Sequence, residues 1–150
     1  MKMNSRIKLK ILSLTLIIIL FGLASCGQRA AVSNPQILTG VVTDVHCFLK
    51  KPDPTLDAKK CLLMPACAAT GYGLAVMHSD KTYKFYFLDG EFAPAASGAQ
   101  DAVAKLINDS TKTDHFYFTV TGELTGEMKK AEDGKSYPIL KISEISESDG

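Results

Sequence analysis

Three cysteines lie close together in the stretch HCFLKKPDPTLDAKKCLLMPAC, residues 46–67. Cys47, Cys61 and Cys67 share this stretch with His46 and Met64. Thiolate and thioether sulfurs select copper(I), zinc or iron–sulfur centres, and imidazole suits zinc and copper. Cysteines in exported proteins also pair as disulfides or exchange thiols. The stretch therefore predicts one of three kinds of chemistry: a soft-metal site of copper or zinc, a structural disulfide with one spare thiol, or thiol redox exchange.

The spacing of the cysteines excludes several familiar motifs. Zinc ribbons need cysteine pairs two to four residues apart, whereas the intervals here are thirteen and five residues. The chain has no Cys-x-x-Cys in this stretch, which disfavours a thioredoxin-like site and covalent haem attachment. If two of these three cysteines form a disulfide, the third remains unpaired. An odd cysteine in an exported domain indicates a free thiol, an intermolecular bridge or a metal ligand.

Residues 57–70 have the composition of a helix that Pro65 interrupts. We expect Asp57 to cap its first turn and Gly71 to follow its end. Along an unbroken helix Cys61 and Cys67 would be separated by about 9 Å, beyond the reach of a disulfide, and a bend at Pro65 would relax that limit.

Cys47 is the easier disulfide partner for either of the later cysteines. Such a bridge would hold the segment against the preceding strand and contribute about 2–4 kcal/mol. Met64 and Met77 also fit a role as core residues, which is the commoner use of methionine. His78 and His115 fall in predicted strands, and His46 is the histidine that we would test as a ligand.

The elements around this segment are mainly strands. Alternating or β-branched runs predict five strands, and a helix bearing Val103 and Ile107 is expected between the third and the fourth, with Ser97 and Gln100 as its capping box. The five runs cover 37–45, 73–79, 82–89, 115–124 and 132–145. This order predicts an all-β fold with one or two helices, a small OB-like Greek-key barrel, with a five-stranded α+β sandwich as the alternative.

The third predicted strand is rich in aromatic residues. Tyr83, Phe85 and Phe87 alternate onto one face, and Tyr86 falls on the other face. Tyr86 and Tyr117 could together form an exposed stacking platform for a ligand, although aromatic pairs on adjacent strands commonly stabilise the sheet instead.

The first 25 residues have the pattern of a lipoprotein signal peptide. A basic region containing Lys2, Arg6, Lys8 and Lys10 precedes the apolar run ILSLTLIIILFGLA, which ends at LASC, residues 23–26. The apolar run is short for a transmembrane helix, and LASC has the form of a bacterial lipobox. We therefore expect acylation of Cys26, palmitate included, and a lipid anchor in the cell envelope on the extracytoplasmic face of the inner or outer membrane.

The predicted mature chain has three parts. Residues 26–35 form the lipidated N-terminus and a tether, 36–147 form the OB-like domain, and 46–72 form its cysteine-bearing insertion. Without the four basic residues of the signal, 13 Lys and Arg face 16 Asp and Glu, a net charge of −3. A slightly acidic domain outside the cytoplasm argues against a nucleic-acid partner.

Catalytic patterns are weak in this sequence. No serine stands in a recognisable hydrolase motif, and the carboxylates are scattered over predicted turns. Cys61 follows Lys59 and Lys60, whose charges would lower the pKa of a thiol nucleophile, so it is the best candidate for such a role. We expect no enzymatic activity.

Four segments together resemble a family of small exported bacterial proteins of uncharacterised function. They are TGVVTDVHCF, KKCLLMPACAATGYGLAVM, KTYKFYFLD and FTVTGEL, and they cover most of residues 38–145. The residues that match the family pattern are Gly40, Asp44, Cys47, Phe48, Lys59 or Lys60, Cys61, Cys67 and Gly71. The resemblance implies an OB-like barrel with a cysteine-bearing insertion after the first strand. It brings no established activity.

The chain departs from that family pattern in two ways. The interval from Cys61 to Cys67 is longer, and a histidine often found ahead of the second cysteine is replaced by residues such as Asp57 or Ala58. Both departures weaken a metal-site interpretation.

Together these observations predict a membrane-anchored lipoprotein that binds a small ligand or an envelope protein without catalysis, with its cysteines partly a structural staple. The alternative is a lipoprotein that binds copper(I) or zinc, or exchanges thiols, through Cys47, Cys61 and Cys67, with His46 or Met64 as further metal ligands.

Overall fold

The computed structural model describes residues 34–51, 53–92 and 97–150. The predicted signal peptide, its lipobox and Cys26 lie outside the described residues. Within the described residues, no helix is both long and apolar enough to cross a membrane.

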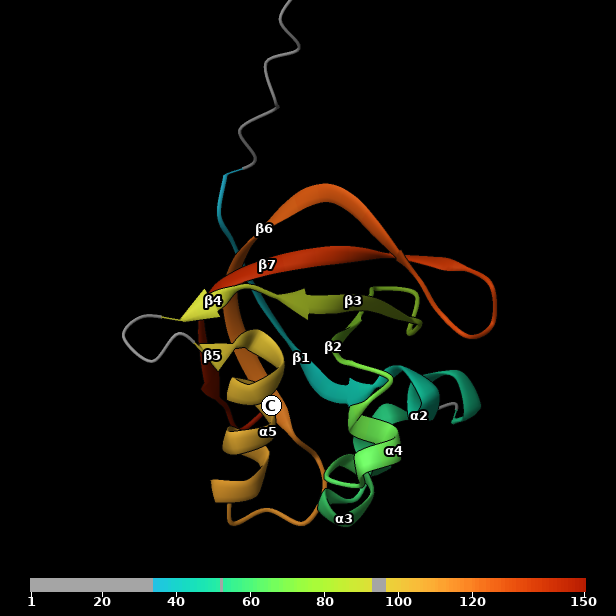
Figure 1. Ribbon diagram of the computed structural model, residues 1–150, viewed down its shortest axis with the longest axis vertical. Coiled ribbons are helices and arrows are strands. Elements are labelled where there is room, and N and C mark those ends of the chain that lie inside the picture. Colours follow the sequence, from blue (N-terminus) through green and yellow to red (C-terminus); the bar gives the residue numbers. More distant parts are fainter. Residues whose placement is uncertain (1–33, 52, 93–96) are drawn as a thin grey trace, which may run out of the picture. The chain divides into compact units, whose positions relative to one another are not determined.

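Five strands close into a barrel (Figure 1). The barrel strands are β1 (Gln36–Asp44), β2 (Tyr72–Met77), β3 (Tyr83–Asp89), β6 (Tyr117–Lys130) and β7 (Ser136–Glu147). Their order around the barrel is β1-β2-β3-β7-β6, with β6 closing against β1. Neighbours are antiparallel except β3 and β7, which run parallel. The predicted OB-like barrel is therefore confirmed, because its strand order and the helix between the third and fourth barrel strands are both present.

Helices are more numerous and shorter than the expected one or two. They are α2 (Val45–Lys50), the 3-10 turn η1 (Pro54–Leu56), α3 (Lys59–Leu62), α4 (Pro65–Ala68) and α5 (Ala99–Asp109). Two short strands, β4 (Glu91–Phe92) and β5 (Ser97–Gly98), form a separate pair before α5. Figure 1 shows α2, α3 and α4 gathered beside β1 and β2 in the connection between these strands.

The barrel interior holds the main hydrophobic core. Val42, Leu74, Phe118 and Leu140 are fully buried there, together with Val103 and Ile107 of α5 and other residues. Tyr86 is also buried in this core, at 6 % exposure, so the predicted exposed platform of Tyr86 and Tyr117 is wrong. Its strand alternates as expected, but the face that carries Tyr86 points into the barrel, although the exposed Lys84 precedes it by two residues.

A second apolar cluster lies on the outer side of β3. Phe85 and Phe87 pack with Val45, and Phe48 of α2 lies over Phe85 with ring centroids 4.9 Å apart. Gly73 makes this packing possible, because a Cβ there would lie 2.2 Å from the Phe85 ring. This cluster fixes α2, and so Cys47, against the barrel.

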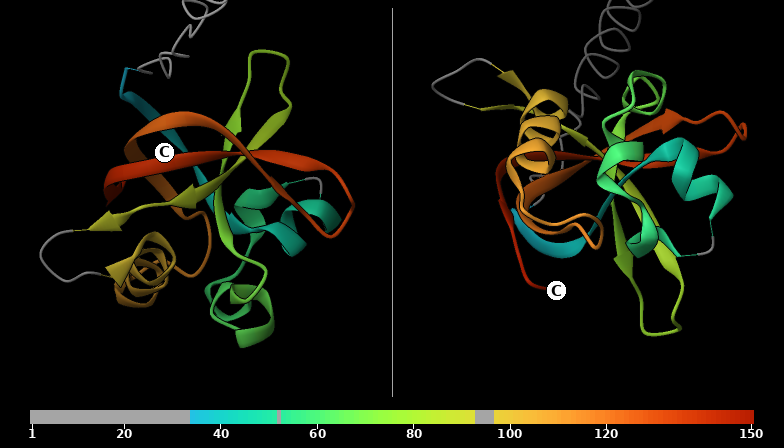
Figure 2. Two further views of the ribbon diagram at one scale, coloured as in Figure 1. Left: turned by 45° about the horizontal axis from the view of Figure 1, so that its top comes forward. Right: turned by 90° about the horizontal axis from the view of Figure 1, so that it is seen from below.

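Three local predictions concern one hairpin turn and two helix ends, and two of the three are confirmed. The β2–β3 hairpin turns at Asp80 and Lys81, and Gly71 has a φ of +95° just after α4. Both the β2–β3 and the β6–β7 hairpin extend beyond the barrel in the views of Figure 2. The predicted capping box of α5 is wrong: its N-cap is Gly98.

Gln100 has a different role from the predicted one. Its side-chain oxygen accepts a hydrogen bond from Tyr72 N at 2.6 Å, and its amide nitrogen donates to the carbonyls of Tyr72 and Leu88. Gln100 thus ties the first turn of α5 to β2 and β3.

Candidate functional site: a cluster of three thiols

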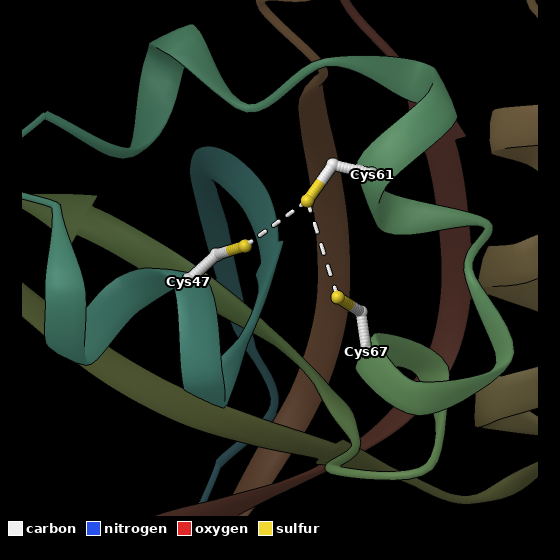
Figure 3. Close-up of side chains that lie close together, drawn as sticks. All are labelled: Cys47, Cys61 and Cys67. Carbon is white, nitrogen blue, oxygen red and sulfur yellow. Dashed lines mark hydrogen bonds between the residues drawn. The ribbon is translucent and has the colours of Figure 1, made fainter.

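The sulfurs of Cys47, Cys61 and Cys67 converge on one point (Figure 3). Cys61 Sγ lies 3.5 Å from Cys47 Sγ and 3.9 Å from Cys67 Sγ, and all three sulfurs lie within 4.8 Å of one another. Among the described residues, all three are free thiols. Cys47 and Cys67 are buried, and Cys61 is half-buried.

Each thiol comes from a different short helix. Cys47 is on α2, Cys61 on α3 and Cys67 on α4. Pro65 begins α4, and Met64 before it is extended with φ −66° and ψ 133°, because the proline ring disfavours the helical conformation of its predecessor. The break turns α4 back toward α3, which brings together two sulfurs that a continuous helix would hold apart. The predicted interruption at Pro65 is confirmed.

Two hydrogen bonds to the backbone and one buried side chain hold the α3 end of the segment. Lys59 N donates to Thr113 O at 2.7 Å, and Leu62 is fully buried in the barrel core. The Tyr72 hydroxyl donates to Leu62 O at 2.7 Å. These contacts set the position of Cys61 relative to the barrel.

The α2 end is anchored by Asp44, the last residue of β1. Asp44 has extended backbone dihedrals, and its Oδ1 accepts a hydrogen bond from Cys47 N at 3.0 Å, as an N-cap does. Thr70 Oγ1, which follows α4, is 3.3 Å from the same oxygen. One carboxylate therefore joins the two ends of the inserted segment.

Asp57 is buried and does not cap a helix as predicted. Its carboxylate accepts hydrogen bonds from the Thr43 hydroxyl and from Lys51 Nζ, the latter at 2.5 Å, so it is turned toward β1 and away from the following helix. The N-cap of α3 is Ala58, which has no side-chain acceptor. The bond to Asp57 raises the pKa of Lys51.

The surroundings of Cys47 and Cys67 favour their protonated form. Burial, then hydrogen bonding to Asp44 and Cys61, then the charges of Asp57 and Asp44 raise the pKa of Cys47 far above its ordinary value. Burial and the charge of Asp44 also raise the pKa of Cys67. Because the thiolate is the reactive form of cysteine, these two residues are poor nucleophiles in the absence of a cation.

The ammonium group of Lys59, one of the two cations that the sequence places before Cys61, is bound elsewhere. The ammonium group of Lys59 donates to the carbonyls of Asn108 and Ser110, at 2.7 and 2.8 Å, and so lies over the end of α5. Lys60 is exposed. The cation whose charge acts on Cys61 is Lys51, and its ammonium group is paired with Asp57.

His46, the histidine that the sequence predicted as a further ligand, does not face the three sulfurs. His46 Nδ1 is 2.6 Å from Glu132 Oε1 and its Nε2 is 2.8 Å from Lys50 Nζ, so both ring nitrogens face partners other than the three sulfurs. Met64 is 47 % exposed, and Met77 is 55 % exposed. His78 lies in the β2–β3 turn and His115 has a φ of +55° before β6. The structure thus brings together the three cysteines without His46.

Sequence reasoning gave too little weight to Asp44 and Asp57, which are 0 % and 1 % exposed beside the cluster. An available signal was the position of Asp44 immediately before helix-forming residues and three residues before Cys47, which is typical of an N-cap.

No protein-family model matches the chain, and no curated protein matches it. The resemblance to small exported bacterial proteins stays a prediction. The site must therefore be interpreted from its own geometry.

Proposed function

We propose that this protein is a lipid-anchored, extracytoplasmic lipoprotein that binds one soft metal ion, zinc or copper(I), through Cys47, Cys61 and Cys67. The observation that carries the proposal is the convergence of three sulfurs from three helices. With metal–sulfur bonds of about 2.3 Å, tetrahedral coordination separates the sulfurs by about 3.8 Å. The contacts of 3.5 and 3.9 Å at Cys61 match that spacing.

The chemistry of the site supports a resident metal more than thiol exchange. A bound cation would stabilise the thiolates and displace three thiol protons to solvent, which offsets the effect of burial. Thiol exchange needs a thiolate at ambient pH, and the raised pKa values of Cys47 and Cys67 oppose it. A disulfide between Cys47 and Cys61 would bring two of the sulfurs to about 2.0 Å and leave Cys67 over.

The test is the metal content of the full-length protein, purified in detergent without oxygen and offered zinc or copper(I). We expect one metal ion per chain by native mass spectrometry. Cys61→Ser should abolish that stoichiometry, because Cys61 is the sulfur nearest to both others. His46→Ala and Met64→Leu are the matched controls, and both should retain the metal.

A metal-free protein that still exposes three alkylatable thiols after both metals have been offered would contradict the proposal. A chain lighter by two hydrogens even under anaerobic purification would favour the disulfide staple, with the third cysteine spare.

A second candidate function is the binding of a small apolar ligand, without catalysis. A groove of about 610 Å³ lies beside β3, lined by Phe48, Tyr83, Phe85 and Tyr137 together with residues of both hairpins. Its aromatic lining fits an apolar or aromatic molecule. Changes in the tyrosine and phenylalanine NMR signals of the groove on addition of small aromatic compounds would support this role, and unchanged signals would count against it.

A further inference from the structure

The buried carboxylate of Asp44 has one oxygen without a partner. Asp44 is 0 % exposed. Its Oδ1 receives the hydrogen bonds of Cys47 N and the Thr70 hydroxyl. Within the described residues, its Oδ2 is buried and has no hydrogen-bond partner. Buried polar atoms without partners are uncommon in folded proteins, and a buried carboxylate oxygen of this kind, on the residue that caps the helix of Cys47, is suited to meet a cation.

Asp44 is joined to the segments that carry two of the thiols. Its Oδ1 accepts a hydrogen bond from Cys47 N at 3.0 Å, and the Thr70 hydroxyl, 3.3 Å from the same oxygen, also donates to Cys67 O. Its position is also fixed, because its backbone ends β1 and its Oδ1 caps α2.

Asp57 shows what a fully paired carboxylate looks like at the same site. One of its oxygens accepts from Thr43 and the other from Lys51. The two carboxylates are almost equally buried, yet only that of Asp44 retains an oxygen that is free to meet a cation.

We propose that Asp44 Oδ2 is the fourth ligand of the metal held by Cys47, Cys61 and Cys67, and that the site therefore prefers zinc to copper(I). This inference rests on the proposed function. Zinc takes a carboxylate oxygen into a tetrahedral set, whereas copper(I) favours soft sulfur alone. The hydrogen bonds at Oδ1 would orient the carboxylate in the way that outer partners orient metal ligands.

Charge gives a second reason for a divalent ion. Three thiolates and one carboxylate carry four negative charges, which zinc reduces to two and copper(I) only to three. In a buried site the uncompensated charge is costly, and Lys51 is already paired with Asp57.

The test uses the full-length protein in detergent under reducing conditions, with zinc or copper(I) as the probe. Asp44→Asn removes the charge but keeps a side-chain oxygen that can cap α2. Asp57→Asn is the matched control. We expect Asp44→Asn to weaken zinc binding by about tenfold or more and to leave copper(I) binding unchanged, while Asp57→Asn retains zinc affinity within about threefold.

A direct readout of ligation is the infrared difference spectrum between zinc-loaded and metal-free protein. Zinc should shift the carboxylate stretch in the wild type and in Asp57→Asn, and that shift should be absent from Asp44→Asn. Aspartate labelled with carbon-13 shows in the wild type whether an aspartate ligates zinc at all, and a band that does not shift on labelling would overturn the inference whether or not the variants fold.

The outcomes separate this inference from the proposed function. Zinc binding through the three thiols with no carboxylate shift would overturn the role of Asp44 and leave the metal site standing. Tighter binding of copper(I) than of zinc would overturn the zinc preference. A wild-type protein that takes up neither metal would refute the metal site itself, and the fourth ligand with it.

Discussion

At the scale of single residues, the cluster combines buried acidic groups with two thiols, Cys47 and Cys67, whose pKa values are raised. Burial, and then the neighbouring Asp44 and Asp57, disfavour ionisation of Cys47, since a second negative charge in a buried site is costly. A metal ion reverses this effect. The buried charge of Asp44, which disfavours ionisation of Cys47 and Cys67 in the apo protein, would therefore favour a bound divalent cation.

The raised thiol pKa values predict a loss of apo stability in alkaline solution. In the unfolded chain the thiols ionise near pH 9, whereas in the folded chain those of Cys47 and Cys67 stay protonated to higher pH. The unfolded state then binds fewer protons, so the free energy of unfolding falls as the pH rises above about 9, by at most about 1.4 kcal/mol per pH unit for each thiol. Below pH 8 these thiols should give no pH dependence.

Urea unfolding of metal-free protein at pH 7 and at pH 10 measures this effect. Cys47→Ala is the comparison, because it removes the thiol with the strongest shift while other titrating groups remain. An equal pH dependence in the two proteins would show that Cys47 ionises as easily in the folded chain as in the unfolded one.

At the scale of elements, the site depends on three short helices that cannot be stable by themselves. Helices of four to six residues gain little from their own hydrogen bonds, so tertiary contacts must hold α2, α3 and α4. The aromatic cluster under Phe48 holds α2, and the burial of Leu62 holds α3. The break at Pro65 sets the direction of α4.

Pro65→Ala should therefore weaken metal binding more than it weakens the fold. Alanine permits α3 and α4 to merge into one helix, along which Cys61 and Cys67 would separate to about 9 Å. We expect a loss of metal affinity of about tenfold or more, with a change in the free energy of unfolding of the apo protein of about 1 kcal/mol or less.

Metal titration and urea unfolding of the same preparations measure both quantities. Pro35→Ala is the control, because Pro35 is exposed and precedes β1. Unchanged affinity in Pro65→Ala would mean that contacts other than the proline impose the break.

At the scale of the whole molecule, the proposed lipid anchor would hold the barrel and its metal at a membrane surface. The anchor proposal comes from the sequence of residues 1–26. A dually or triply acylated cysteine binds a membrane stably, because each buried methylene contributes about 0.8 kcal/mol.

Cys26→Ser is expected to release the protein from the membrane fraction. The measurement is fractionation of the expressing bacterium together with labelling by a palmitate analogue, which should be present in the wild type and absent from the variant. Metal binding by the three remaining cysteines should be unaffected. A labelled, membrane-bound Cys26→Ser protein would contradict lipidation at this residue.

The sequence by itself determined the five strands and their order along the chain, and it left a barrel and a sandwich open, whereas the closure into a barrel was decided by the tertiary structure. Period-two alternation in runs such as TYKFYFLD, with Asp80 and Lys81 at a turn, is a local signal that tertiary contacts did not override. The helix between the third and fourth barrel strands was likewise predicted from a local sequence pattern. The predicted capping box failed because the side chain of Gln100 bonds to β2 and β3, which are far away in the sequence.

Only the tertiary structure decided the site. Cysteine spacing left a disulfide, a metal and redox exchange open, since it says nothing about where sulfurs point in space. The convergence of Cys47, Cys61 and Cys67 depends on the break at Pro65 and on the docking of α2 over Phe85. The unpartnered oxygen of Asp44 likewise arises from burial, because the same residue in an exposed turn would be hydrated.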